Sequence, residues 1–190
     1  YPYNDTASQL LGYVGEVSEE ELADIKKEDP NTQIGPGTIL GRAGLEKMYD
    51  AVLRGVDGGK QLEVDAAGRP VAEVGRKNTV PGRSIHLTID VKLQKAAEDA
   101  VKQQLDSLHA SGIPATGAAL VAMDPNTGAI LAMVSEPGFN PNWFAKGITA
   151  KQWTQLNEDK RHPFENRAIA GEYPPGSPFK IITGTAALDL

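Results

Sequence analysis

The chain has 190 residues, 40% of them hydrophobic, so it can bury a sizeable core as one large or two modest domains. A net charge of −6 and the absence of a Lys/Arg-rich block argue against a nucleic-acid partner. The chain has no cysteine, which excludes disulfides and thiolate metal sites. The histidines His86, His109 and His162 are far apart in sequence and lack a suitably spaced partner, so we expect no metal and no cofactor.

The two ends of the sequence resemble cuts within a longer chain. Tyr1 is not an initiator methionine followed by a signal-like region, and the apolar run that reaches Leu190 has no capping residue. No run approaches the roughly 18 apolar residues that a membrane span needs. We therefore expect the chain to be a fragment.

The first third of the sequence predicts short helices separated by turns. Residues 12–15 are typical of a strand that enters a turn. Ser18 and Glu21 form a capping box, which opens a helix that runs to about Asp29, where a proline follows. Residues 41–55 predict one helix with a terminal glycine. The apolar residues on its inner face are Leu45, Met48, Val52 and Leu53.

A β-hairpin is predicted next. Residues 61–66 and 71–76 alternate polar and apolar side chains around a turn at 67–70, and the charged alternate positions suggest one solvated face. The composition then changes, and a proline-glycine pair precedes Arg83. We place a domain boundary there. The predicted domains are residues 1–83 and residues 84–190.

The second domain begins with an alternating segment and a long helix. Residues 84–90 predict a half-buried strand, and Asp90 then caps a helix that runs to about His109. The apolar stripe of this helix consists of Leu93, Ala97, Val101, Leu105 and Leu108.

Two apolar strands follow this helix. Residues 117–123 and 129–135 are apolar at nearly every position and flank a five-residue turn, so they predict a hairpin that is buried on both faces. We expect helices to cover it on each side, namely the helix after Asp90 and a helix after Ser177. The predicted fold class is α+β, with short helices and hairpins followed by an antiparallel sheet covered by helices.

Aromatic residues gather after this hairpin. Thr149 and Gln152 form a second capping box that opens a short helix. The aromatic side chains of Trp143, Phe144 and Trp153 are compatible with a substrate groove or with ordinary packing, and packing is the more common case. We include none of them in the site.

The candidate site is the stretch from Tyr173 to Lys180. Its two prolines and Gly176 disfavour a helix before them, and the apolar run that follows predicts a buried helix. Ser177 is therefore expected at or near the N-terminus of a helix. Lys180 lies one turn further on the same face, where its amine can reach the serine hydroxyl. A serine beside a base is the arrangement of an activated nucleophile.

A less specific interpretation is also open. Ser-x-x-Lys specifies only two positions in four, and such a pair also occurs as an N-cap serine and a solvated lysine. The same tetrad is known from penicillin-binding proteins and class A β-lactamases, but any motif is a hypothesis.

Further segments favour the catalytic interpretation of the tetrad. Together with it they resemble a class B penicillin-binding protein, most closely of the elongation type. The resemblance covers nearly the whole chain. The matching segments are Gly41-Arg42-Ala43-Gly44-Leu45-Glu46 with Tyr49 and Leu53-Arg54-Gly55, Leu87-Thr88-Ile89-Asp90 with Leu93-Gln94, Asp124-Pro125-x-x-Gly128, Ser135-x-Pro137, Asn140-Pro141-Asn142, Asn166-Arg167-Ala168 and Tyr173-Pro174-Pro175-Gly176-Ser177.

The resemblance implies a peptidoglycan D,D-transpeptidase of cell-wall synthesis and cell shape. Ser177 would be the acylated nucleophile and an oxyanion-hole N–H donor, and Lys180 would accept its proton. The substrates would be peptidoglycan stem peptides, and β-lactams would trap the serine. The first domain would be the non-catalytic pedestal, of the dimerisation type.

This sequence also departs from the family pattern. Pro178 replaces a common threonine, which a helix's first turn tolerates, and Arg42 replaces a frequent lysine. The Ser-x-Asn and Lys-(Ser/Thr)-Gly motifs do not occur in matching positions, so we expect them beyond Leu190. The 190 residues alone are therefore expected to be inactive.

The family also implies a cellular setting. A membrane helix would precede Tyr1 and hold the protein at the extracytoplasmic face of the bacterial membrane, with a membrane glycosyltransferase of the elongation machinery as partner. Two alternatives stay open, a β-lactam-sensing receptor and a non-catalytic scaffold that docks the glycosyltransferase. The pedestal segments argue against the receptor.

Overall fold

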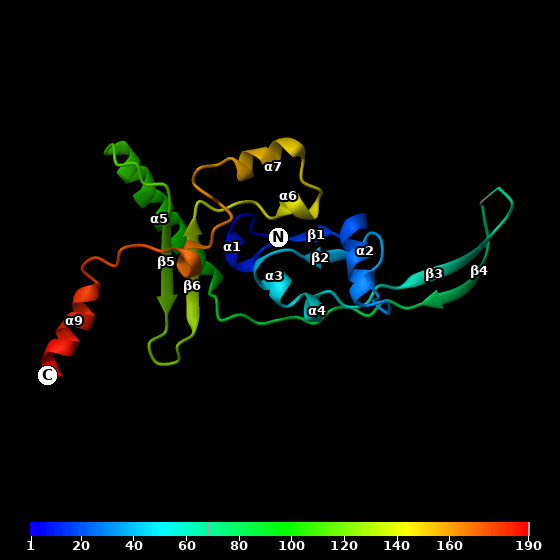
Figure 1. Ribbon diagram of the computed structural model, residues 1–190, viewed down its shortest axis with the longest axis horizontal. Helices are drawn as coiled ribbons and strands as arrows, with labels where there is room; N and C mark the ends of the chain where they lie inside the picture. The colour runs from blue at the N-terminus through cyan, green and yellow to red at the C-terminus, as the bar shows by residue number, and fades with distance from the viewer. Residues whose placement is uncertain (68, 190) are drawn as a thin grey trace.

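The structure is a computed structural model that describes residues 1–67 and 69–189. The described residues form short helices, one long helix and two-stranded antiparallel sheets, which confirms the α+β class. Figure 1 shows a central body with the β3–β4 hairpin projecting at one end and α9 at the other. The elements are α1 Ser8–Leu11, β1 Val14–Glu16, α2 Glu19–Glu28, β2 Ile39–Gly41, α3 Gly44–Met48, α4 Asp50–Leu53, β3 Gly59–Val64, β4 Pro70–Lys77, α5 Val91–Ala110, β5 Ala118–Met123, β6 Ile130–Glu136, α6 Asn142–Ala145, α7 Ala150–Asn157, α8 Arg167–Ala170 and α9 Phe179–Leu188.

The first small core lies between α2 and the β1–β2 sheet. β1 pairs antiparallel with β2, and Val17, Leu22 and Leu40 are buried together. The Ser18 hydroxyl accepts the Glu21 amide at 3.2 Å, so the predicted serine cap is present. The Glu21 carboxylate instead forms an ion pair with Arg42 at 2.5 Å, which joins α2 to the end of β2.

The prediction of one helix over residues 41–55 is wrong. Gly41 belongs to β2, and two short helices, α3 and α4, follow it. Tyr49 has φ −109° and ψ 17°, outside the helical region, and separates them. The Asp50 carboxylate accepts the Gly41 amide at 2.9 Å, which anchors the second turn to β2 and leaves Met48 74% exposed. A side-chain contact to a neighbouring strand therefore overrides the helical pattern.

The predicted hairpin is confirmed as β3 and β4, which pair antiparallel with two irregularities in register. The expectation of a single solvated face is wrong, because nearly every residue of both strands is exposed, including Leu62 at 47% and Val71 at 67%. The hairpin projects from the body, so neither of its faces lies against another layer (Figure 1). Gly68 of the predicted turn lies outside the described residues.

Residues 84–90 do not form the predicted strand. They approach the start of β6 through the Asp90 amide, which donates to the Leu131 carbonyl at 2.9 Å, and through the Thr88 hydroxyl, which donates to the Ile130 carbonyl at 2.6 Å. These two bonds do not make a ladder, so the alternating pattern produces an irregular segment. The Asp90 carboxylate then accepts the first-turn amides of α5, as predicted.

The main hydrophobic core lies between α5 and the β5–β6 hairpin. Ala97 and Val101 of α5 pack against Ala132 and Val134 of β6. The prediction that helices cover both faces is wrong: Val121, on the other face of β5, is 45% exposed. One long helix lies along the hairpin, and α8 touches part of both strands. Apolar residues at every position therefore do not guarantee two covering layers.

The N-terminal segment packs against the second half of the chain. The Ala7 amide donates to the buried Glu98 carboxylate at 2.8 Å, and the Gln9 side-chain amide donates to the carbonyls of Pro137 and Pro163, each at 2.9 Å. These contacts cross the proposed boundary after Arg83, which stays a prediction.

Aromatic rings also pack where the N-terminal segment meets the second half of the chain, a region that we call the joint. Tyr13 stacks on Phe144 with ring centroids 3.9 Å apart, and Trp153 lies 6.1 Å from Phe164. Ordinary packing is thus the role of Phe144 in this structure, whereas Trp153 is 46% exposed. No helix within the described residues is long and apolar enough to cross a membrane.

Candidate active site

Ser177 lies two residues before Phe179, the first residue of α9, and Pro178 is the N-cap, so the prediction that Ser177 lies at or near a helix N-terminus is confirmed. Gly176 has φ +58°, a left-handed conformation that other residues adopt at a cost, and it turns the chain into the helix. The Lys180 amide donates to the Ser177 carbonyl at 3.0 Å, and the Phe179 amide donates to the Gly176 carbonyl at 3.1 Å. A tight first turn therefore connects the two predicted site residues.

The side chains of Ser177 and Lys180 share one end of α9, but the structure shows no hydrogen bond between them. Both residues are exposed. The positive end of the ten-residue helix lies beside the serine and favours negative charge on its oxygen. The local backbone therefore provides part of the geometry of an activated serine, whereas the contact between hydroxyl and amine is not formed.

The prediction that this helix is buried against the β5–β6 hairpin is wrong. Every described residue of α9 is exposed, and Figure 1 shows the helix well away from the strands. α5 already occupies the hairpin face that carries Ala132 and Val134. Pro174 and Pro175 lie in an irregular segment that leads the chain away. The predicted end of the helix at Leu190 lies outside the described residues. The exposed apolar side chains of α9 are Phe179, Ile181, Ile182 and Leu188.

One buried polar group near this segment has no role in the sequence-based prediction. Arg167 begins α8, and its amide donates to the Ser135 hydroxyl at 3.0 Å. The same hydroxyl donates to the Glu165 carbonyl at 2.9 Å. The sequence contains a signal for this cluster, because Ser135 and Arg167 belong to two of the segments that resemble the family. That resemblance gave no function for either residue.

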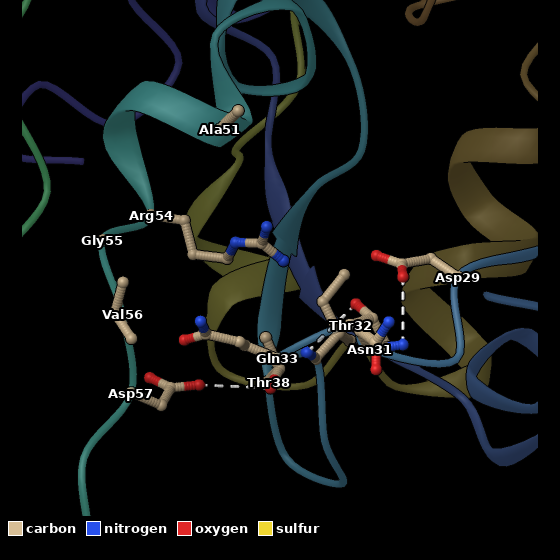
Figure 2. Close-up of a pocket in the computed structure, with 11 residues that line it drawn as sticks. Asp29, Asn31, Thr32, Gln33, Thr38, Ala51, Arg54, Gly55, Val56 and Asp57 are labelled. Atoms are coloured by element: carbon tan, nitrogen blue, oxygen red, sulfur yellow. Dashed lines mark hydrogen bonds between the residues drawn. The ribbon is translucent and has the colours of Figure 1, made fainter. Parts of the chain in front are cut away.

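The structure also contains a polar pocket of about 390 Å³ beside α4, remote in sequence from Ser177. Figure 2 shows Arg54 extending toward Thr32 across this pocket, and a hydrogen bond of 3.2 Å from the Thr38 hydroxyl to the Asp57 carboxylate. The Arg54 guanidinium also lies 3.5 Å from the Asp50 carboxylate. The pocket lacks both predicted site residues, so we do not assign it the acyl-transfer chemistry.

Two family models match the chain. The penicillin-binding protein dimerisation domain matches residues 1–87, and the penicillin-binding protein transpeptidase domain matches residues 118–190. The first match contains the pocket and the β3–β4 hairpin, and the second contains Ser177 and Lys180.

Curated relatives match nearly the whole chain. The peptidoglycan D,D-transpeptidase MrdA of Acinetobacter baumannii is 38% identical over 99% of this chain and 26% of its own length. MrdA of Escherichia coli K12 is 32% identical over 99% of this chain and 28% of its own length. Penicillin-binding protein 3 of Bacillus subtilis is 38% identical over 99% of this chain and 25% of its own length. The chain thus spans about a quarter of the length of these relatives.

Two solved structures share the fold. Pseudomonas aeruginosa PBP2 in complex with WCK 5153 has a TM-score of 0.72 and 34% identity, over 100% of this chain and 34% of that chain. Helicobacter pylori PBP2, solved as a complex with MreC, has a TM-score of 0.70 and 32% identity, over 100% of this chain and 32% of that chain. On the two domain matches, the relatives and these folds together, the chain belongs to the penicillin-binding protein family, with PBP2 enzymes among its solved relatives.

Proposed function

We propose that the whole protein is a peptidoglycan D,D-transpeptidase that acts through an acyl-enzyme on Ser177. The observation that carries this proposal is the position of Ser177 at the start of α9, one turn before Lys180, in a chain of this family. The relatives named D,D-transpeptidase support the reaction class. Residues 1–83 would form the non-catalytic pedestal, and residues 84–190 the first part of the catalytic domain.

The reaction would proceed in two steps. The Ser177 hydroxyl oxygen attacks the carbonyl carbon between the two D-alanines of a stem peptide, and the Lys180 amine accepts its proton. The amide bond breaks, the proton passes to the departing D-alanine amine, and an ester remains on Ser177. An amine of a neighbouring stem peptide then attacks the ester carbonyl, the bond between the acyl carbon and the Ser177 oxygen breaks, and the amine's proton passes to that oxygen, which regenerates the serine hydroxyl. The Ser177 N–H is the proposed donor to the oxyanion formed in each step.

The remaining parts of the site would come from the rest of the whole protein. We infer that the second oxyanion donor and the Ser-x-Asn and Lys-(Ser/Thr)-Gly motifs lie outside these 190 residues. The exposed apolar side chains of α9, such as Ile181 at 75%, fit this inference, because burying them would stabilise a larger domain. The same packing would bring the Lys180 amine and the Ser177 hydroxyl into contact.

The partners and location follow from the same proposal. The Pseudomonas aeruginosa PBP2 was solved with WCK 5153, and the Helicobacter pylori PBP2 with MreC. We propose that β-lactams acylate Ser177 and that the pedestal binds proteins of the elongation machinery, including a membrane glycosyltransferase and an MreC-like partner. The protein would be anchored at the extracytoplasmic face of the membrane.

Covalent labelling tests this proposal. The chain, extended to the length of its relatives, is incubated with a fluorescent penicillin, and the labelled peptide is identified by mass spectrometry. We expect one label on Ser177, none in Ser177→Ala, and labelling slower by about 10²-fold or more in Lys180→Ala. Ser84→Ala, at an exposed serine, is the control. Full labelling of Ser177→Ala, or a label on another residue, would disprove the assignment.

A further inference from the structure

Arg167 is the last buried residue before Ser177 in the described chain. Its side chain is only 4% exposed. Burying a guanidinium costs free energy unless its N–H groups are hydrogen-bonded. The Arg167 side chain and its hydrogen-bond partners therefore hold one another in position. Residues 172–177, which lead to the serine, are all exposed.

The Arg167 guanidinium closes a turn of the backbone. One terminal nitrogen donates to the His162 carbonyl at 3.2 Å, and the other donates to the Arg161 carbonyl. The second nitrogen also lies 3.6 Å from the Glu165 carboxylate. Together with the bond from the Arg167 amide to the Ser135 hydroxyl, these contacts hold the turn against β6.

The guanidinium also lies against the start of β5. A Cβ atom at Gly117 would come within 2.6 Å of the Arg167 Nε, so glycine is needed for this close approach. Arg167 therefore lies between the beginning of one strand, the end of the other and the turn before α8. Each side of the cluster is fixed by main-chain atoms or a buried side chain.

The path to the serine begins at this cluster. α8 contacts both strands of the hairpin, whereas the chain after it leaves the hairpin and leads to α9 (Figure 1). The position at which this segment starts is therefore set by α8 and, through it, by Arg167. A nucleophile must be held within about 0.5 Å of its working geometry.

We propose that Arg167 is a positioning residue for Ser177. Arg167 contacts no reacting atom. It fixes the position of the chain just before the segment from Tyr173 to Gly176, which connects α8 to Ser177. This inference rests on the proposed role of Ser177 as nucleophile. It predicts that loss of the guanidinium slows acylation without weakening the preceding non-covalent binding of the β-lactam.

The test uses the protein extended to the length of its relatives and rapid-mixing kinetics with a fluorescent penicillin. The non-covalent dissociation constant, the acylation rate constant and the labelled fraction are measured separately. For Arg167→Met we expect an acylation rate constant lower by about 10- to 100-fold, with a dissociation constant within about threefold of the parent. Added guanidinium ion should restore part of the rate.

Two variants sharpen this test. Arg167→Lys keeps the charge but not the planar fork, so we expect an intermediate loss of about threefold to tenfold. Lys160→Met changes a neighbouring exposed cation whose side chain is not part of the cluster, and it should leave the acylation rate constant unchanged.

The outcomes separate the two claims. If both Arg167→Met and Arg167→Lys lower only the labelled fraction, while the labelled molecules react at the parent rate, Arg167 is merely structural and the inference is overturned. If the parent protein acquires no label on Ser177, the proposed function fails and this inference fails with it. A slower acylation step with unchanged binding in either variant supports it.

Discussion

Two regions of the molecule differ in the contacts that hold them in place. One is the joint around the N-terminal segment, and the other is the segment that ends in α9. At the joint, the buried Glu98 carboxylate accepts the Ala7 amide, and Gln9 donates to two carbonyls of the second half of the chain. α9 is exposed along its described length. Both regions contain apolar side chains, but the buried polar bonds belong to the joint.

This difference separates local from tertiary information. The turn at Gly176 and the start of α9 follow from short-range bonds, so the serine is placed at a helix N-terminus without outside support. The orientation of that helix depends on contacts that the described chain does not supply. Substitutions at the joint should therefore destabilise the chain, whereas substitutions on α9 should not.

The largest effect on stability is expected at Gln94, which is fully buried on α5. Its side-chain amide exchanges two hydrogen bonds with the main chain of Met133, at 2.8 and 2.9 Å, and donates to Glu98 at 2.7 Å. Gln94→Ala leaves these groups unpaired and should lower the free energy of unfolding by about 3 kcal/mol in urea denaturation. Gln104→Ala, at an exposed position of the same helix, is the control, and an equal loss there would contradict the interpretation.

Two valines of the β5–β6 hairpin give the next comparison. Val134 is 1% exposed against α5, and Val121 is 45% exposed on the uncovered face. Val134→Ala should cost about 2 kcal/mol of unfolding free energy, and Val121→Ala about 0.5 kcal/mol, because only the first leaves a cavity. Equal losses in chemical denaturation would show that both faces are covered in solution.

A smaller effect on stability, which depends on pH, is expected at Glu136. Burial raises the pKa of Glu136 above its ordinary 4.5, although the nearby Lys102 charge opposes this. The folded state therefore binds this proton more tightly than the unfolded state, so the stability contribution is greatest below 4.5 and is lost as pH rises through the raised pKa. The melting temperature of the parent, relative to that of Glu136→Gln, should therefore fall as the pH rises through this range. Glu158→Gln is the control. A difference that is constant with pH would exclude this linkage.

The smallest effect is expected on α9. Ile182 is 61% exposed, so Ile182→Ala removes few contacts from the 190-residue chain. Its unfolding free energy should change by no more than about 0.5 kcal/mol, the usual range for exposed positions. A loss as large as that of Val134→Ala would mean that α9 packs against the body in solution.

The local elements could largely be predicted from the sequence. The caps at Ser18, Asp90 and Thr149, both hairpins and the serine at a helix start all follow from interactions within a few residues. The family resemblance added a function that periodicity alone does not provide.

Long-range contacts explain what could not be predicted. The break at Tyr49 depends on a bond from Asp50 to a neighbouring strand, and the burial of Gln94 depends on Met133, 39 residues away. The apolar pattern of α9 shows that the helix can be buried, but it does not identify what buries it. Arg167 was visible only as part of a matching segment, because its partners are main-chain carbonyls.

Acylation of the 190-residue chain, compared with that of the protein extended to the length of its relatives, tests the central claim most directly. Both are incubated with a fluorescent penicillin, and the label on Ser177 is quantified over time by mass spectrometry. The extended protein should be labelled stoichiometrically. The 190-residue chain should react at least about 10²- to 10³-fold more slowly, because even a single missing oxyanion donor costs that much. Equally fast, stoichiometric labelling of Ser177 in both would contradict the claim that this site needs tertiary support.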